Sequence, residues 1–229
     1  MQLNKKQNSL NKKILNLIIY ILRYFSIIDK NYDEISDKIN FGSKKADIFF
    51  KKNLKKSKYY FEYGSGNSTI LSKKYKKKFL SIETDKSFYR FIKKKGIREI
   101  LYYNIGPTKY YSIPILPLIL IQEKIKKYAN SINLFKKKFK KNPDLILIDG
   151  RFRVYVTLTV LFFFLKNKIT GKTIIIIDDF KYRKNYQIIK KIIKVRLIGR
   201  MGIIEINKKT KFAEFKIRKN MKKYILNFA

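Results

Sequence analysis

The segment FEYGSGNST, residues 61–69, places two closely spaced glycines between an apolar strand and the start of a helix. Glycine has no Cβ, so Gly64 and Gly66 let a ligand approach the backbone at the N-terminus of that helix. A nicotinamide dinucleotide site would have a third glycine at position 69, where this chain has Thr69. The dinucleotide interpretation is therefore weakened, and a tight turn without a ligand remains the alternative.

From residue 59 onward, short apolar segments alternate with helical ones. Two of the apolar runs, DLILID and TIIIID, are unbroken, as is typical of parallel strands that helices cover on both faces. The predicted strands are YYFEY (59–63), FLSIE (79–83), 100–104, DLILID (144–149) and TIIIID (173–178). This alternation predicts an α/β fold with a mostly parallel sheet.

The later segments predict two further helices and a hairpin. Apolar residues at three- and four-residue spacings indicate a long helix over 121–139, closed by Pro143, and VYVTLTVLFFFL (154–165) is expected to be a buried helix. MGIIEIN (201–207) and FAEFKI (212–217) alternate in the manner of strands and are separated by KKTK. We expect them to pair as an antiparallel C-terminal hairpin.

The first 55 residues are predicted to form a helical N-terminal extension, and residues 56–229 the main domain. One helix is expected over 10–28, and one or two short helices over 32–53, with a break near Gly42. The apolar run at 14–28 is too short for a confident membrane span and contains Arg23. We therefore expect a buried or lid helix, and no stable membrane insertion.

Composition excludes several classes of site. The chain has 55 Lys and Arg against 16 Asp and Glu, a net charge of +39, with no cysteine and no histidine. Disulfides, thiolate metal sites and a histidine base are therefore excluded. The excess is mostly lysine, which favours a whole-chain residue bias over selection for phosphate binding. The lysine runs at 73–78 and 136–141 are interpreted as solvated helix faces, with a nucleic-acid surface as the alternative.

FEYGSGNST resembles motif I of class I S-adenosylmethionine-dependent methyltransferases, which have an acidic residue where this chain has Glu62. Glu83 comes 19 residues after Gly64, at the end of the second predicted strand. The same family has a ribose-binding carboxylate there, and a carboxylate can accept two hydrogen bonds from a vicinal diol. Asp85 is the alternative ribose acid. DGRFR (149–153) and DDFKYR (178–183) resemble a group of bacterial methyltransferase-like proteins.

This resemblance covers roughly residues 59–190 and implies a Rossmann-like, seven-stranded class I methyltransferase fold and a cytoplasmic enzyme. It implies that S-adenosylmethionine is the cofactor. Asn104 to Gly106 would hold the adenine, and Asp149 would face the reacting end. The residues expected around the methionine part of the cofactor are Glu62, Gly64, Ser65, Gly66 and Ser68.

Asp149, Asp178 and Asp179 follow two predicted central strands, at the sheet edge where ligands bind in open α/β folds. Their spacing also resembles that of magnesium-dependent catechol-type O-methyltransferases, which would make all three Mg²⁺ ligands. Helix capping and direct contact with cofactor or substrate are the alternatives. The lysine base of those enzymes aligns with Phe152, so no general base is identified.

The leading hypothesis is methyl transfer from S-adenosylmethionine to an oxygen or nitrogen of a small, anionic acceptor. Asp149, Asp178 and Arg151 are the candidate catalytic residues, and Tyr110 and Tyr111 would shape the acceptor pocket. Arg151, like Arg153 and Arg183, either recognises an anion or pairs with the aspartates. A small-molecule acceptor is favoured over nucleic acid. The alternatives are an RNA methyltransferase and a non-catalytic cofactor-binding or scaffold protein.

Overall fold

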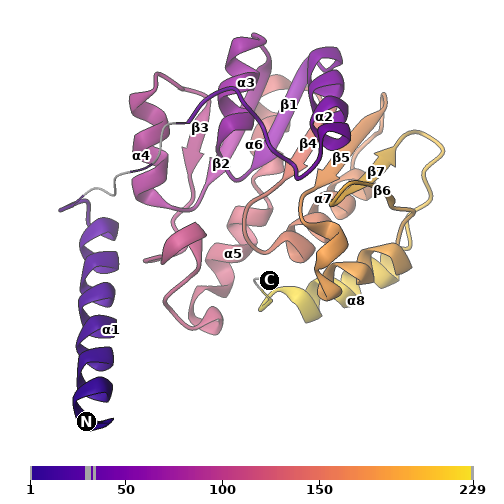
Figure 1. Cartoon of the computed structure of the whole chain (residues 1–229). Helices are drawn as coiled ribbons and strands as arrows, with labels where there is room; N and C mark the ends of the chain where they lie inside the picture. Colours follow the sequence, from indigo (N-terminus) through magenta and orange to yellow (C-terminus); the bar gives the residue numbers. More distant parts are fainter. Residues whose placement is uncertain (1, 29–31, 33–34, 228–229) are drawn as a thin grey trace.

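The computed structural model describes residues 2–28, 32 and 35–227 and shows a sheet with helices on both of its faces (Figure 1). The strands of this part of the chain are β1 (Tyr59–Tyr63), β2 (Lys78–Glu83), β3 (Ile100–Tyr102), β4 (Leu145–Ile148), β5 (Thr173–Ile177), β6 (Arg196–Ile198) and β7 (Met201–Ile206). The α-helices are α1 (Gln2–Tyr24), α2 (Lys44–Lys56), α3 (Asn67–Lys74), α4 (Lys86–Lys94), α5 (Gln122–Ala129), α6 (Ile132–Phe139), α7 (Arg153–Lys166) and α8 (Glu214–Tyr224). Shorter 3₁₀ segments are η1 (Tyr110–Ser112), η2 (Leu118–Ile121), η3 (Phe180–Tyr182) and η4 (Lys184–Lys191).

The strands lie in the order β3-β2-β1-β4-β5-β7-β6 across the sheet. The first five are parallel to their neighbours among themselves, whereas β7 is antiparallel to both β5 and β6. The predicted α/β fold, a mostly parallel sheet with an antiparallel end, is therefore confirmed for the described residues. The direction of strand addition reverses between β1 and β4, and ligands bind beyond the carboxyl ends of the strands at such a reversal.

Successive residues of β1 pack on opposite faces of the sheet, which explains why large aromatic side chains occur on both faces of the strand. Tyr60 packs against Phe50 of α2, with ring centroids 6.1 Å apart, and Phe61 packs against Phe135 of α6 at 5.6 Å. All four side chains are fully buried. Burial on both faces leaves the loops at the strand ends as the places where polar side chains gather.

The antiparallel edge contains only one of the two strands predicted for the hairpin. β7 covers the predicted segment 201–207, but its hairpin partner is the preceding β6. The segment 212–217 leads into α8, so its prediction as a strand is wrong. Ile217 and Ile225 are buried at helical spacing. The helical period is visible only in a sequence window longer than the six residues 212–217, which by themselves alternate like a strand.

The long helix predicted over 121–139 is instead two helices, α5 and α6, interrupted at Asn130 and Ser131. The side chain of Asn130 donates to the carbonyl oxygen of Lys126 at 2.9 Å. Asn and Ser side chains offer such non-helical hydrogen bonds to the backbone, which favours a break. The apolar positions of both helices still belong to one buried cluster: Ile125, Tyr128, Ile132 and Phe135.

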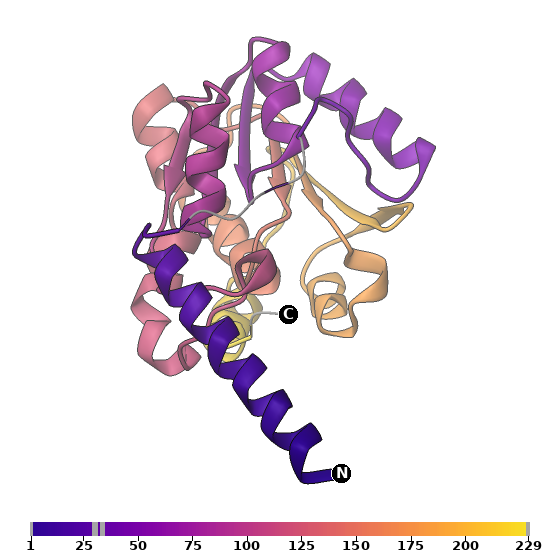
Figure 2. The same cartoon turned by 60° about the vertical axis from the view of Figure 1, so that its left-hand side comes forward.

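The N-terminal helix α1 extends away from the rest of the molecule in both views (Figures 1 and 2). Its apolar side chains Leu10 and Ile14 are 57% and 49% exposed. Burial, one of the two expectations for this segment, is therefore wrong. Within the part of the chain that the structure describes, no helix has both the length and the apolar character that a membrane span needs.

Between α1 and β1, the structure contains one of the helices predicted over 32–53. Residues 33–34 lie outside the described residues, and residues 35–43 form no helix. α2 begins directly after Gly42 and Ser43, where the break was predicted. Ser43 caps this helix, because its hydroxyl oxygen accepts a hydrogen bond from the Ala46 N–H at 3.3 Å.

Candidate functional site

Two short loops, one after β1 and one after β4, meet where the strand order reverses. Gly64 has a φ of +88°, and a Cβ at this position would lie 2.7 Å from the backbone nitrogen of Gly150. A Cβ on Gly150 would in turn lie 2.2 Å from the hydroxyl of Tyr128. Close packing therefore requires glycine at both positions, and it holds the two loops together.

Gly66, at the start of α3, has different surroundings. Its φ of 169° is extended backbone that any residue adopts, and no atom of the described residues lies within 4 Å of a Cβ built on it. Its N–H donates to the hydroxyl of Thr69 at 2.9 Å. The backbone at Gly66 therefore faces open space, which a ligand approaching it would need.

Glu62 lies fully buried beneath this loop. Its carboxylate accepts hydrogen bonds from the hydroxyls of Tyr60 at 2.6 Å, of Ser68 at 2.7 Å, and of Thr69. Burial raises the pKa of Glu62, and the three hydroxyl donors oppose that rise. Glu62 and Ser68 consequently hold the first turn of α3 against β1.

Glu83 ends β2 and binds the glycine loop from the other side. One carboxylate oxygen accepts the Ser65 N–H at 3.0 Å, and the other accepts the N–H groups of Thr84 and Asp85 at 2.7 and 2.8 Å. Burial raises the pKa of Glu83 to about 7, although these backbone donors favour its charged form. The carboxylate therefore changes its charge near neutral pH.

A cavity of about 540 Å³ opens between these loops. Its volume is within the range of about 300 to 1,000 Å³ typical of small-molecule sites. The lining includes three carboxylates, at Glu83, Asp85 and Asp149, and two guanidinium groups, at Arg151 and Arg153. The lining residues are Tyr32, Ile35, Gly64, Ser65, Asn67, Glu83, Thr84, Asp85, Phe88, Tyr111, Ser112, Asp149, Gly150, Arg151 and Arg153.

The segment between β3 and α5 is attached to two residues of the cavity wall, Glu83 and Arg151. The Ser112 hydroxyl donates to Glu83 at 3.2 Å, and Nε of Arg151 donates to the carbonyl oxygen of Tyr111. Tyr111 and Ser112 have φ values of 56° and 58°, in a region that costs about 1 to 3 kcal/mol for most residues. The side chain of Tyr110, predicted to shape the pocket, lies outside what the structure describes.

Arg153 joins the loops that follow β4 and β5. It pairs with the carboxylate of Asp149 at 2.7 Å and with that of Asp179 at 3.3 Å. It also donates to the backbone carbonyls of Asp149, Gly150 and Asp178. Pairing with aspartates, one of the two predicted roles for the arginines, is thus the role of Arg153.

Asp178 is paired with an arginine from the turn between β6 and β7. Its side chain is 3% exposed, and both carboxylate oxygens accept from Arg200, at 2.8 and 2.7 Å. Arg200 also reaches the carboxylate of Asp179 at 3.3 Å and the carbonyl oxygen of Asn40 at 3.2 Å. This bidentate pair ties the antiparallel edge of the sheet to the end of β5.

These ion pairs bear directly on the predicted magnesium site. Asp149, Asp178 and Asp179 each face a guanidinium group, and the described residues contain no group of three or more acidic side chains that could hold a metal ion. Mg²⁺ is bound by carboxylate and water oxygens that are free to coordinate. The side chains present here therefore do not fit a magnesium ion.

The cavity brings together only part of the predicted site. The predicted residues that line it are Gly64, Ser65, Glu83, Asp85, Tyr111, Asp149, Arg151 and Arg153. Its lining, as far as the chain is described, does not include Glu62, Gly66, Ser68, Asn104, Asp178 or Asp179. Asn104, expected near the adenine, instead accepts a hydrogen bond from Tyr24 of α1 at 3.2 Å and one from the Gly106 N–H at 2.8 Å.

Sequence reasoning missed Tyr32, Asn67 and Phe88 in the cavity lining, and Arg200 beside it. The rings of Tyr32 and Phe88 meet edge to face at 5.0 Å and form an aromatic wall near Asp85. Phe88 could have been found from its place in the first turn of the helix after β2. Arg200 has no such local signal, because its partner Asp178 lies on another loop.

No model of a known protein family matches the chain, and no curated protein matches it in sequence. A solved structure does resemble it: the crystal structure of a methyltransferase-like protein from Silicibacter pomeroyi. The two share 19% sequence identity, with a TM-score of 0.65, over 83% of this chain and 98% of that chain. The chain therefore has the α/β fold of a methyltransferase-like protein.

Proposed function

We propose that this chain is an S-adenosylmethionine-dependent methyltransferase that acts on an oxygen or nitrogen of a small, anionic acceptor. The observation that carries the proposal is the place of Glu83, a buried carboxylate at the carboxyl end of β2 that lines the cavity beside the glycine loop. Class I methyltransferases, which the sequence resembles, have their ribose-binding acid at the end of this strand. The fold of the chain supports the same role here.

The groups around the cavity fit this cofactor. A carboxylate at Glu83 or Asp85 can accept hydrogen bonds from both hydroxyls of a ribose. The ring of Phe88 offers an apolar surface to an adenine base, and Asp149 offers a negative charge to an α-amino group. The open space beside Gly66 leaves room for a ligand along the loop.

The bound cofactor would supply a methyl group on a positively charged sulfur. The contribution of the chain is to position the acceptor and exclude water. Arg151 lines the cavity near Arg153, and burial lowers its pKa, so an anionic acceptor would compensate for its desolvation. Asp149 also lines the cavity, whereas Asp178, which is paired with Arg200, would act by positioning the loop after β5.

We also propose that the cofactor-binding domain includes every helix that packs on the sheet, α2 among them. The expected boundary at residue 55 would divide α2, whose Phe50 and Leu54 are fully buried in the core. The boundary that we propose therefore lies before α2, near Gly42. On this assignment, the N-terminal extension consists of α1 and the segment that follows it.

The test is calorimetric titration of S-adenosylmethionine, and of its demethylated product, into the wild type and Glu83→Ala. Moderate salt suppresses non-specific attraction to a chain of net charge +39. We expect micromolar binding by the wild type and a loss of at least about tenfold in the variant. Glu123→Ala, which removes the same charge at a side chain 73% exposed, is the matched control and should bind like the wild type.

Two results would contradict the proposal. Absence of binding to the wild type would leave only the fold, and equal affinities for Glu83→Ala and Glu123→Ala would remove the assigned role of Glu83. Cofactor binding without methyl transfer to any member of a panel of small carboxylates, phosphates and phenols would favour the non-catalytic alternative instead.

A further inference from the structure

Five exposed apolar side chains of α1 form a stripe along the helix. They recur at spacings of four, seven, eight and eleven residues from Leu10, which places them on one face. Their exposed fractions are between 38% and 57%. The stripe consists of Leu10, Ile14, Leu17, Ile18 and Ile21.

Outside this stripe, α1 carries its charged side chains and one further exposed apolar side chain, Leu15, which is 58% exposed. The helix contains four lysines and Arg23 but no acidic residue. Lys12 and Lys13 are exposed. An apolar stripe on a helix whose charged residues are all basic is typical of helices that lie in the plane of a membrane interface.

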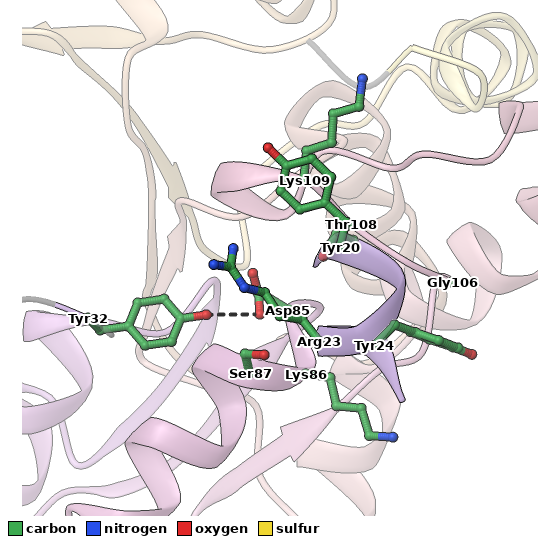
Figure 3. A pocket seen from close by; sticks show the side chains of 10 residues that line it. All are labelled: Tyr20, Arg23, Tyr24, Tyr32, Asp85, Lys86, Ser87, Gly106, Thr108 and Lys109. Carbon is green, nitrogen blue, oxygen red and sulfur yellow. Dashed lines mark hydrogen bonds between the residues drawn. The ribbon is translucent and has the colours of Figure 1, made fainter. Parts of the chain in front are cut away.

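The C-terminal end of α1 is fixed to the body of the molecule. Tyr20 is 8% exposed, and the hydroxyl of Tyr24 accepts a hydrogen bond from Asn104 at 2.9 Å. Figure 3 shows Arg23 of α1 beside Asp85, which also lines the large cavity. Because the helix is held at this end, its stripe projects outward and does not fold back on the sheet.

We propose that α1 docks the protein on the surface of an anionic lipid bilayer. The apolar stripe would enter the boundary between headgroups and acyl chains, and the lysines would face anionic headgroups. The net charge of +39 attracts the whole molecule to such a surface. The same charge disfavours a second copy of the chain as the partner of the stripe, because two such molecules repel each other.

A second exposed apolar surface lies on the segment that α1 contacts. In η2, Ile119 and Leu120 are 62% and 70% exposed. This segment follows β3 and also contains Thr108 and Lys109, which line a pocket together with Tyr20 of α1 (Figure 3). The docking helix is therefore attached at the edge of the sheet where the cavity opens.

The test is co-flotation of the full chain with lipid vesicles at moderate salt. Vesicles of phosphatidylcholine containing about one third phosphatidylglycerol are compared with pure phosphatidylcholine, and we expect at least about tenfold stronger partitioning to the anionic vesicles. Ile14→Glu puts a carboxylate into the stripe and should weaken partitioning by about tenfold or more.

Asn16→Glu is the matched control, because it makes the same change in charge about 200° around the helix. It should change partitioning less than about threefold, and circular dichroism should show unchanged helix content for both variants. Equal losses in the two variants would mean that bulk charge alone drives binding and would overturn the proposal. Lipid-free dimerisation that Ile14→Glu abolishes would overturn it in favour of a second copy, as would failure of the wild type to float.

Discussion

The carboxylates at the two halves of the sheet's carboxyl edge have different kinds of partner. At the β1–β2 half, Glu83 accepts hydrogen bonds from neutral N–H groups and keeps its place in the cavity wall. At the β4–β5 half, Asp149 and Asp178 form ion pairs with Arg153 and Arg200. The first half is therefore suited to recognise a neutral diol, whereas the second is a network of ion pairs that braces the loops.

The largest effect should come from breaking the brace at Arg200. Removing this guanidinium leaves the carboxylate of Asp178 buried and unpaired, so Arg200→Ala should lower the free energy of unfolding by about 3 kcal/mol. Arg196→Ala is the control, because its pair with Glu205 spans 3.5 Å and both side chains are about half exposed. It should cost less than about 1 kcal/mol. Chemical denaturation measures the free energy of unfolding of both variants. Equal losses would show that the pair of Arg200 with Asp178 contributes no more to stability than an exposed ion pair.

The glycine loop offers the second comparison, between a glycine that packing requires and one beside open space. Gly64→Ala would place a Cβ 2.7 Å from backbone at a φ of +88°, and it should destabilise the fold by about 2 kcal/mol. Gly66→Ala meets no described atom within 4 Å and should change stability by less than about 0.5 kcal/mol.

Gly66→Ala should weaken cofactor binding even though it leaves the stability of the fold nearly unchanged. The alanine methyl group would occupy the space that we assign to the ligand, so titration calorimetry should show weaker binding by a variant whose thermal unfolding is normal. If Gly66→Ala binds S-adenosylmethionine like the wild type, the ligand does not pass beside this residue.

The difference between the β1–β2 half and the β4–β5 half also explains which parts of the site the sequence could predict. Gly64, Gly66 and Glu83 lie within 20 residues, on consecutive strands and loops, so their spacing already indicates that they meet. The position of Asp149, Asp178 and Asp179 at the carboxyl edge was also predictable, because each apolar run that forms a central strand ends at an aspartate. Their chemistry was not, since it depends on which cations reach them.

Two further misses have the same physical origin in tertiary contacts. The segment 212–217 alternates like a strand, but burial of Ile217 against the core selects a helix. The amphipathic pattern of α1 was visible, but no pattern within the helix tells whether the sheet covers the stripe. Local periodicity gives the faces of an element, and only the assembled fold gives their partners.

The smallest predicted effect is a pH dependence of ligand affinity that requires Glu83. Because burial raises the pKa of Glu83 to about 7, about one tenth of it is charged at pH 6 and about nine tenths at pH 8. Only the carboxylate can accept from both ribose hydroxyls, so affinity should rise by up to about tenfold across this range. The ligand to titrate is 5′-methylthioadenosine, which has no group that ionises near neutral pH. Glu83→Gln should remove the rise, and a wild-type affinity that is flat or falls with pH would show that the charged form of Glu83 does not hold the ribose.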